Sequence, residues 1–113
     1  MAKVSILESL KNEILNKFKG ESKIIFRLMY SLEENPNKGK LLGNVGGIII
    51  KELRYKNFRF YFITDGYKLK LFNQDSLSDL LIRFVRMSDK KDQQEAINEI
   101  KKILIKLGAD GFK

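Results

Sequence analysis

The first third of the chain contains two stretches in which apolar residues recur at helical spacing. They cover residues 10–18 and 24–32, and each places its apolar side chains on one face of a helix. Gly20 separates the stretches, and Pro36 ends the second because proline disfavours helix in the residue before it. The pattern predicts a helical hairpin that covers one face of a sheet. Residues 4–7 precede it, either as a short strand or as the beginning of the first helix.

Alternation replaces helical spacing in the middle of the chain. Residues 48–54 and 58–64 are rich in β-branched and aromatic residues, which favours two neighbouring strands. In the second stretch successive side chains point to opposite faces, with Phe58, Phe60 and Phe62 on one face and Arg59, Tyr61 and Ile63 on the other. We expect the three phenylalanines to pack under the helical hairpin.

The segments around these two strands complete the predicted sheet. Three glycines between residues 43 and 47 predict a loop over residues 38–47. The pair Asp65-Gly66 predicts a tight hairpin turn, because glycine accepts the positive φ of such turns, with a return strand over residues 67–72. Residues 73–79 predict a second loop, and residues 80–86 predict a further strand.

A third amphipathic stretch closes the chain. Apolar residues between Ala96 and Leu107 form a helical stripe, and Gly108 ends it. The elements in this order predict an α+β fold in a single domain over residues 1–113. Its architecture is a small antiparallel sheet of about three to five strands, with the N-terminal helical hairpin on one face and a C-terminal helix.

Composition excludes several kinds of chemistry. The chain has no cysteine and no histidine, so disulfides, thiolate chemistry and the usual zinc ligands are excluded. We expect neither a metal nor a cofactor. No apolar run approaches the roughly 18–20 residues of a membrane span, and the first residues lack the apolar stretch of a signal peptide. The expected location is the cytoplasm, with no membrane partner.

Positive charge is concentrated in the central third. Residues 38–70 carry eight Lys or Arg against Glu52 and Asp65, a local net charge of +6 out of the formal +8 of the whole chain. The flanking segments are each close to neutral. Charge gathered in this way produces a field that steers a polyanion to one surface, so a nucleic acid is the expected partner.

The absence of histidine limits the groups that a ribonuclease site can use. RNA cleavage needs an acceptor for the 2′-hydroxyl proton and donors for the charged phosphorane. Among the remaining candidates, Arg59 and Tyr61 share a strand face, and Glu52 lies among cations on the preceding strand. The alternative interpretation is that Glu52, Arg54 and Arg59 form a solvated salt-bridge set across the two strands.

The order of these pieces resembles the RelE/HigB-like toxins of the RelE/ParE superfamily, which belong to type II toxin–antitoxin modules. The resemblance covers nearly the whole chain. It rests on a hairpin ending in Leu32-Glu-Glu-Asn-Pro36, the stretches Ile50-Lys-Glu-Leu-Arg54 and Phe58-Arg-Phe-Tyr-Phe62, a Gly-containing turn, Phe84-Val-Arg-Met-Ser-Asp-Lys-Lys91 and a closing helix. Pieces in this order are moderately specific together, although each one alone is common.

The resemblance implies a ribosome-dependent mRNA endoribonuclease that works without metal and inhibits translation. Its implied catalytic residues are Arg59, Arg54, Arg86 and Glu52. Its implied RNA-binding residues are Lys51, Lys56, Tyr61, Tyr67, Lys68, Lys90 and Lys91, with Tyr61 or Tyr67 stacking on a base. The implied partners are the ribosome with its mRNA and an acidic antitoxin protein.

Two other functions stay open for the same fold. One is a ParE-like toxin that inhibits gyrase. The other is a basic nucleic-acid-binding module without catalysis. The second alternative draws support from the missing histidine, and from Gln93 and Gln94, which occupy the neighbourhood where some members of the family have a tyrosine.

Overall fold

The structure, a computed structural model, describes residues 2–70 and 80–112. Its strands are β1 (Lys3–Ile6), β2 (Lys40–Val45), β3 (Ile48–Tyr55), β4 (Phe58–Asp65) and β5 (Leu81–Asp89). Its α-helices are α1 (Glu8–Phe18), α2 (Ser22–Tyr30), α3 (Gly66–Lys70) and α4 (Gln93–Leu107). Short 3₁₀ turns follow α1, α2 and α4, at Lys19–Glu21, Ser31–Glu33 and Gly108–Gly111.

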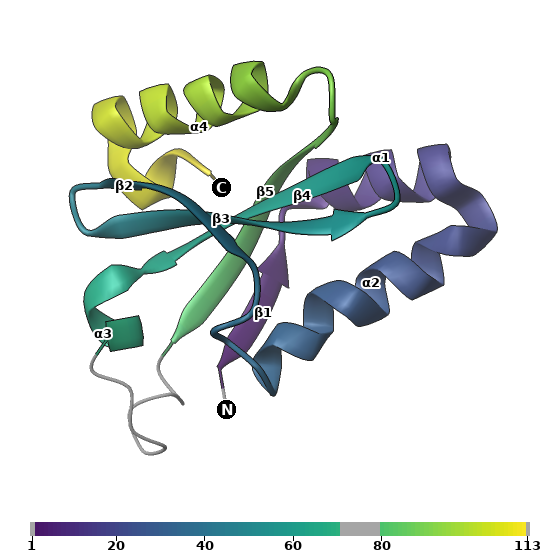
Figure 1. The fold of residues 1–113 in the computed structure, drawn as a ribbon, viewed down its shortest axis with the longest axis horizontal. Helices are drawn as coiled ribbons and strands as arrows, with labels where there is room; N and C mark the ends of the chain where they lie inside the picture. The colour runs from purple at the N-terminus through teal and green to yellow at the C-terminus, as the bar shows by residue number, and fades with distance from the viewer. Residues whose placement is uncertain (1, 71–79, 113) are drawn as a thin grey trace.

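The strands form one mixed sheet in the order β1-β5-β4-β3-β2. Strands β2 to β5 pair antiparallel with their neighbours, and β1 joins the edge beside β5 in parallel. Helices α1 and α2 lie along one side of the sheet and α4 crosses the other side (Figure 1). The predicted α+β class, with an N-terminal helical hairpin and a C-terminal helix, is confirmed. Within residues 2–70 and 80–112, none of the helices is long and apolar enough to cross a bilayer.

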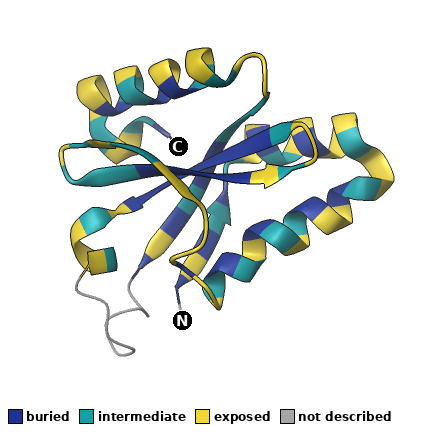
Figure 2. Ribbon diagram, viewed as in Figure 1, coloured by how far each residue is buried: buried dark blue, intermediate teal, exposed yellow. Residues whose placement is uncertain are grey.

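Each face of the sheet has its own hydrophobic core. On the first face, side chains of α1 and α2 such as Ile14 and Ile25 pack against Phe60, Phe62 and Phe84. On the second face, three residues of α4 pack against β3, β4 and β5, together with the C-terminal Phe112; they are Ile97, Ile100 and Leu104. The buried positions follow the sheet and the inner sides of the helices (Figure 2).

The alternation in β4 is confirmed. Phe60 and Phe62 are fully buried under α1 and α2, and Phe58 is partly buried against the same core. Tyr61 and Ile63 belong to the core under α4. Because helices cover both faces, the six residues Arg59–Thr64 are all buried, and β4 is the most enclosed strand of the sheet.

The predicted hairpin turn and return strand after β4 are wrong. Gly66–Lys70 forms the short helix α3, and the strand that pairs with β4 is β5. The reason lies in Asp65, whose carboxylate oxygen accepts hydrogen bonds from the backbone N–H groups of Tyr67 and Lys68, at 2.9 and 3.1 Å. Aspartate capping therefore begins a helix where the Asp-Gly pair indicated a turn. The rest of the predicted return strand and the predicted loop over 73–79 lie outside the described residues.

Part of the predicted loop over residues 38–47 is a strand instead. Residues Lys40–Val45 form β2, which pairs with β3 at the edge of the sheet and shifts register between Leu41 and Gly43. Two of the glycines that indicated a loop form the tight connection to β3, where Gly46 and Gly47 adopt positive φ angles of 59° and 88°. The pairing depends on the open edge of β3, which the local sequence does not reveal.

A bulge in β5 decides which side chains face α4. Tyr61 pairs with Arg86 and Phe62 with Phe84, so Val85 is an extra residue opposite β4. As a result Val85 packs in the core under α4, while the next residue, Arg86, also reaches α4. Without the bulge, simple alternation would place these neighbours on opposite faces.

The first prediction concerns the core under α1 and α2. Because the Phe60 side chain is fully buried there, we expect Phe60→Ala to lower the free energy of unfolding by about 3–5 kcal/mol. Phe58→Ala is the matched control and should cost clearly less, since Phe58 is only partly buried. Urea unfolding of both variants measures the difference, and equal costs would contradict the assigned packing.

Candidate functional site

Four of the predicted site residues meet on the α4 face of β3 and β4. Arg54 pairs across the strands with Arg59, and Glu52 pairs with Tyr61. Residues paired in this way point to the same face of an antiparallel sheet. Tyr61 belongs to the core under α4, so all four side chains lie on that face, at the end of the sheet where α4 begins. The grouping of Arg59 with the Glu52–Arg54 strand is as the sequence predicted.

Glu52 is the buried centre of this group. Its side chain is inaccessible, whereas that of its neighbour Arg54 is 55% exposed. One carboxylate oxygen of Glu52 accepts a hydrogen bond from Arg54 Nε at 3.2 Å. The other accepts one from Gln93 Nε2 at 3.1 Å. Gln93 is the first residue of α4, so this bond joins the helix to the floor of the site.

Tyr61 does not have the exposure that base stacking requires. The ring is fully buried, and its hydroxyl shares a 2.7 Å hydrogen bond with Ser88 of β5. Burial raises the pKa of Tyr61 above its ordinary value near 10, so the phenol stays protonated at neutral pH. In this conformation Tyr61 supports the floor of the site, and the predicted stacking on a base is corrected for this residue.

Arg59 is the arginine of the group with an uncommitted donor. The residue is 6% exposed, and its Nη1 donates to the Phe58 carbonyl at 3.3 Å. Within the described part of the chain, Arg59 Nε is buried and has no hydrogen-bond partner. A buried guanidinium donor without a partner is unfavourable unless an acceptor arrives. Arg59 is therefore not a member of a solvated salt-bridge set, as the alternative interpretation required.

Arg86 is committed to other groups. Its Nε donates to Glu99 of α4 at 2.9 Å, and its Nη1 donates to the Val85 carbonyl at 2.7 Å. The guanidinium also lies over the ring of Phe112, 5.4 Å from the ring centre. Arg86 shares a face with the site, as the pairing with Tyr61 requires, but in this conformation it fastens α4 and the C-terminus to β5.

Three predicted RNA-binding lysines lie at the same end of the sheet. Lys90 and Lys91 are exposed in the connection between β5 and α4, and the Lys90 N–H donates to the Asn57 carbonyl at 3.0 Å. Lys56 lies in the β3–β4 turn and forms a 2.7 Å ion pair with Glu21, in the 3₁₀ turn between α1 and α2. The pair raises the pKa of Lys56, which keeps it charged.

Lys51 is placed on the wrong face for the predicted role. The preceding residue, Ile50, packs in the core under α4. The Lys51 side chain therefore points to the other face, toward α1 and α2, where the residue is 6% exposed. Its ammonium donates to the Asn37 carbonyl at 2.9 Å and holds the connection that leads into β2. Burial lowers the pKa of Lys51 from its ordinary 10.5. Its role here is structural, and the RNA-binding assignment is corrected.

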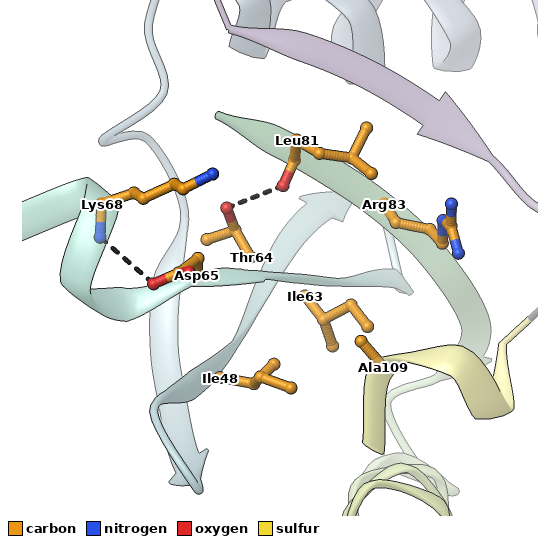
Figure 3. A pocket seen from close by; sticks show the side chains of 8 residues that line it. All are labelled: Ile48, Ile63, Thr64, Asp65, Lys68, Leu81, Arg83 and Ala109. Atoms are coloured by element: carbon orange, nitrogen blue, oxygen red, sulfur yellow. Dashed lines mark hydrogen bonds between the residues drawn. The ribbon is translucent and has the colours of Figure 1, made fainter. Parts of the chain in front are cut away.

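Tyr67 and Lys68 lie on α3, at the opposite end of the sheet from Arg59. About six residues of strand separate the two ends, or roughly 20 Å. Lys68 borders a cavity of about 260 Å³ with an apolar floor that includes Ile48 and Ile63 (Figure 3). This volume is below the usual range for small-molecule sites, about 300–1,000 Å³. The predicted RNA-binding residues therefore do not form one surface.

The residues that hold the site together were not all predicted. Three hydrogen bonds do this: Gln93 bonds to Glu52, Ser88 to Tyr61 and Glu99 to Arg86. Polar residues of these types are common on exposed surfaces, so the sequence alone gave no reason to select them. The one signal in the sequence was the apolar stripe of the last helix. Such a stripe packs against a sheet face and buries the residues there.

Comparison of the chain with protein families, with curated proteins and with solved structures found no match.

The buried lysine makes a prediction about pH. The lowered pKa of Lys51 means that, between that value and 10.5, the unfolded chain binds more protons than the folded one. This group's contribution to stability therefore rises with pH in that window. We expect Lys51→Met to remove the rise, so that the difference in stability between wild type and variant moves in favour of the wild type as pH approaches 10.5. Urea unfolding across this range measures it, with the exposed Lys23→Met as control. Parallel profiles for wild type and Lys51→Met would contradict the assignment.

Proposed function

We propose that this chain is a toxin that cleaves mRNA in the ribosome without metal and thereby inhibits translation. The observation that carries the proposal is the unpartnered, buried Nε of Arg59, held beside Glu52 and Arg54 in the basic part of the chain. A buried guanidinium Nε that lacks a protein acceptor suits a phosphate oxygen. An acidic antitoxin protein is the proposed partner that neutralises this basic surface.

The proposed reaction needs few groups. The RNA 2′-oxygen bonds to the adjacent phosphorus while the bond from phosphorus to the 5′-oxygen breaks. Glu52 accepts the 2′-hydroxyl proton, and water protonates the leaving oxygen. Arg59, with Arg54 beside it, neutralises the charge that develops on the phosphorane, which is the largest contribution expected of such a site. Tyr61 holds the floor on which Arg59 and Glu52 lie.

Burial places a condition on this mechanism. Glu52 and Arg59 are enclosed, so RNA reaches them only if the first turn of α4 or the loop before it moves. The hydrogen bond between Gln93 and Glu52, at 3.1 Å, breaks in that movement. A hydrogen bond to a charged group stabilises by about 1.5–3 kcal/mol, so breaking this one adds a modest cost to the movement.

The same burial favours a second candidate function. If α4 does not move, Glu52 and Arg59 are structural, and the exposed Arg54 and its neighbours bind a nucleic acid without cutting it. The two candidates differ in whether RNA is cleaved, so a cleavage assay separates them.

The second candidate is excluded if expression of the chain cleaves mRNA. We expect expression without a partner protein to arrest growth of a bacterial host and to cut ribosome-bound mRNA. Purified protein should cut the same mRNA far more slowly when ribosomes are left out. Growth arrest with DNA damage and intact mRNA would indicate a gyrase-type target, and unaffected growth with intact mRNA would reject the toxin proposal.

A variant of Arg59 separates catalysis from folding. We expect Arg59→Met to lower the cleavage rate by about 10²–10³, because a preorganised cation is lost from the phosphorane site. Its melting temperature should be unchanged or higher, since replacing a buried, incompletely paired charge by an apolar side chain is often stabilising. The exposed Arg27→Met of α2 is the matched control and should keep full activity. Full activity of a folded Arg59→Met protein would remove Arg59 from the mechanism.

A further inference from the structure

Helix α4 has flanks of opposite charge. On the flank toward α1 and β5, Glu95 and Glu99 face an open pocket of about 330 Å³. Three more carboxylates line this pocket together with Lys17, namely Glu13, Asp89 and Asp92. On the flank toward β2, the side chain of Lys101 lies over Gly43, its Cε about 3.0 Å from where a Cβ would stand. The helix therefore separates an acidic surface from a basic one.

The basic surface continues across the edge of the sheet. Lys40 of β2 is exposed and pairs with Glu52 of β3, so it points to the α4 face. Arg54 is next on that face of β3, and its cross-strand neighbour is Arg59 of β4. We call Lys40, Arg54 and Lys101 the basic arc. It leads from the β2 edge of the sheet to Arg59.

Among the described residues, no exposed carboxylate pairs across the strands with Lys40 or Arg54 of the basic arc. Glu52, which pairs with Lys40 and contacts Arg54, is inaccessible and already accepts hydrogen bonds from Arg54 and Gln93. The three strands that bear Lys40, Arg54 and Arg59 are adjacent, so these cations span roughly 10 Å across the sheet. A short run of consecutive phosphates on a single strand fits a row of this kind. The acidic pocket would repel the same phosphates.

We propose that single-stranded RNA approaches Arg59 along the basic arc, between β2 and α4, and not through the acidic pocket between α1 and α4. The inference rests on the proposed function and adds to it the direction from which the substrate enters. It also assigns binding roles to Lys40 and Lys101. Neither is a group of the cleavage mechanism.

Charge reversal at the basic arc, compared with charge reversal on α2, tests this path of RNA entry. The probe is a short, fluorescently labelled 2′-O-methyl RNA, which lacks the nucleophile and stays intact, titrated at several salt concentrations. We expect Lys40→Glu/Lys101→Glu to weaken binding at least about tenfold. The slope of log affinity against log salt should fall by about 1.4, since each contact to single-stranded nucleic acid contributes about 0.7.

The matched control changes net charge by the same amount elsewhere. Lys23→Glu/Arg27→Glu reverses two exposed cations of α2, on the opposite side of the sheet. We expect this control to weaken binding about twofold and to leave the salt slope unchanged. Circular dichroism and thermal unfolding establish that both double variants are folded.

Each outcome of these titrations supports or overturns RNA entry along the basic arc. Equal losses for the two double variants would show that RNA responds to total charge, and would overturn the arc while the proposed function stands. Binding of the wild type that is independent of salt, or no binding at low salt, would also overturn it. The growth and mRNA-cleavage assays decide the proposed function separately, because they do not depend on binding of free RNA.

Discussion

The enclosure of β4 on both faces is the constraint on which the rest of the structure depends. Phe60 and Phe62 require a cover on one side, and Tyr61 and Ile63 require one on the other. Two helical layers are therefore needed, and α1 with α2 and α4 supply them (Figure 1). Burying aromatic side chains on both sides of one strand gives a large apolar area in a small domain. The cost is that Arg59, at the start of the same buried run, is enclosed as well.

This constraint explains how much of the fold was predictable. Period-two alternation decides which side of a strand each residue occupies, so the two faces of β4 and the pairing of its start with Glu52 and Arg54 followed from the sequence. Elements that depend on distant partners did not. Residues Lys40–Val45 have glycine and little strand preference, and they become a strand because β3 has an open edge. At Asp65 two local signals compete, and side-chain capping of α3 prevails over the turn.

The site was predictable to a smaller extent, for a related reason. Alternation assigns a face but does not say whether that face is covered. Tyr61 was therefore expected at a surface, while α4 buries it. For Lys51, the face itself could have been predicted. Lys51 adjoins Glu52, so alternation alone places the two side chains on opposite faces of the sheet. The position of Arg86 depends on the bulge at Val85, a local irregularity that no sequence period indicates.

The pairing of β1 with β5 has a consequence for synthesis of the chain. Lys3 pairs with Leu81, so the first strand has no partner until nearly the whole domain has been translated. At about 5–20 residues per second, β1 waits about 4 to 16 s for the strand that completes it. Until then the inner faces of α1 and α2 lack the β5 part of their core, including Phe84. The nascent chain therefore exposes apolar helix faces, and the finished fold forms late, after residues of β5 have left the ribosome.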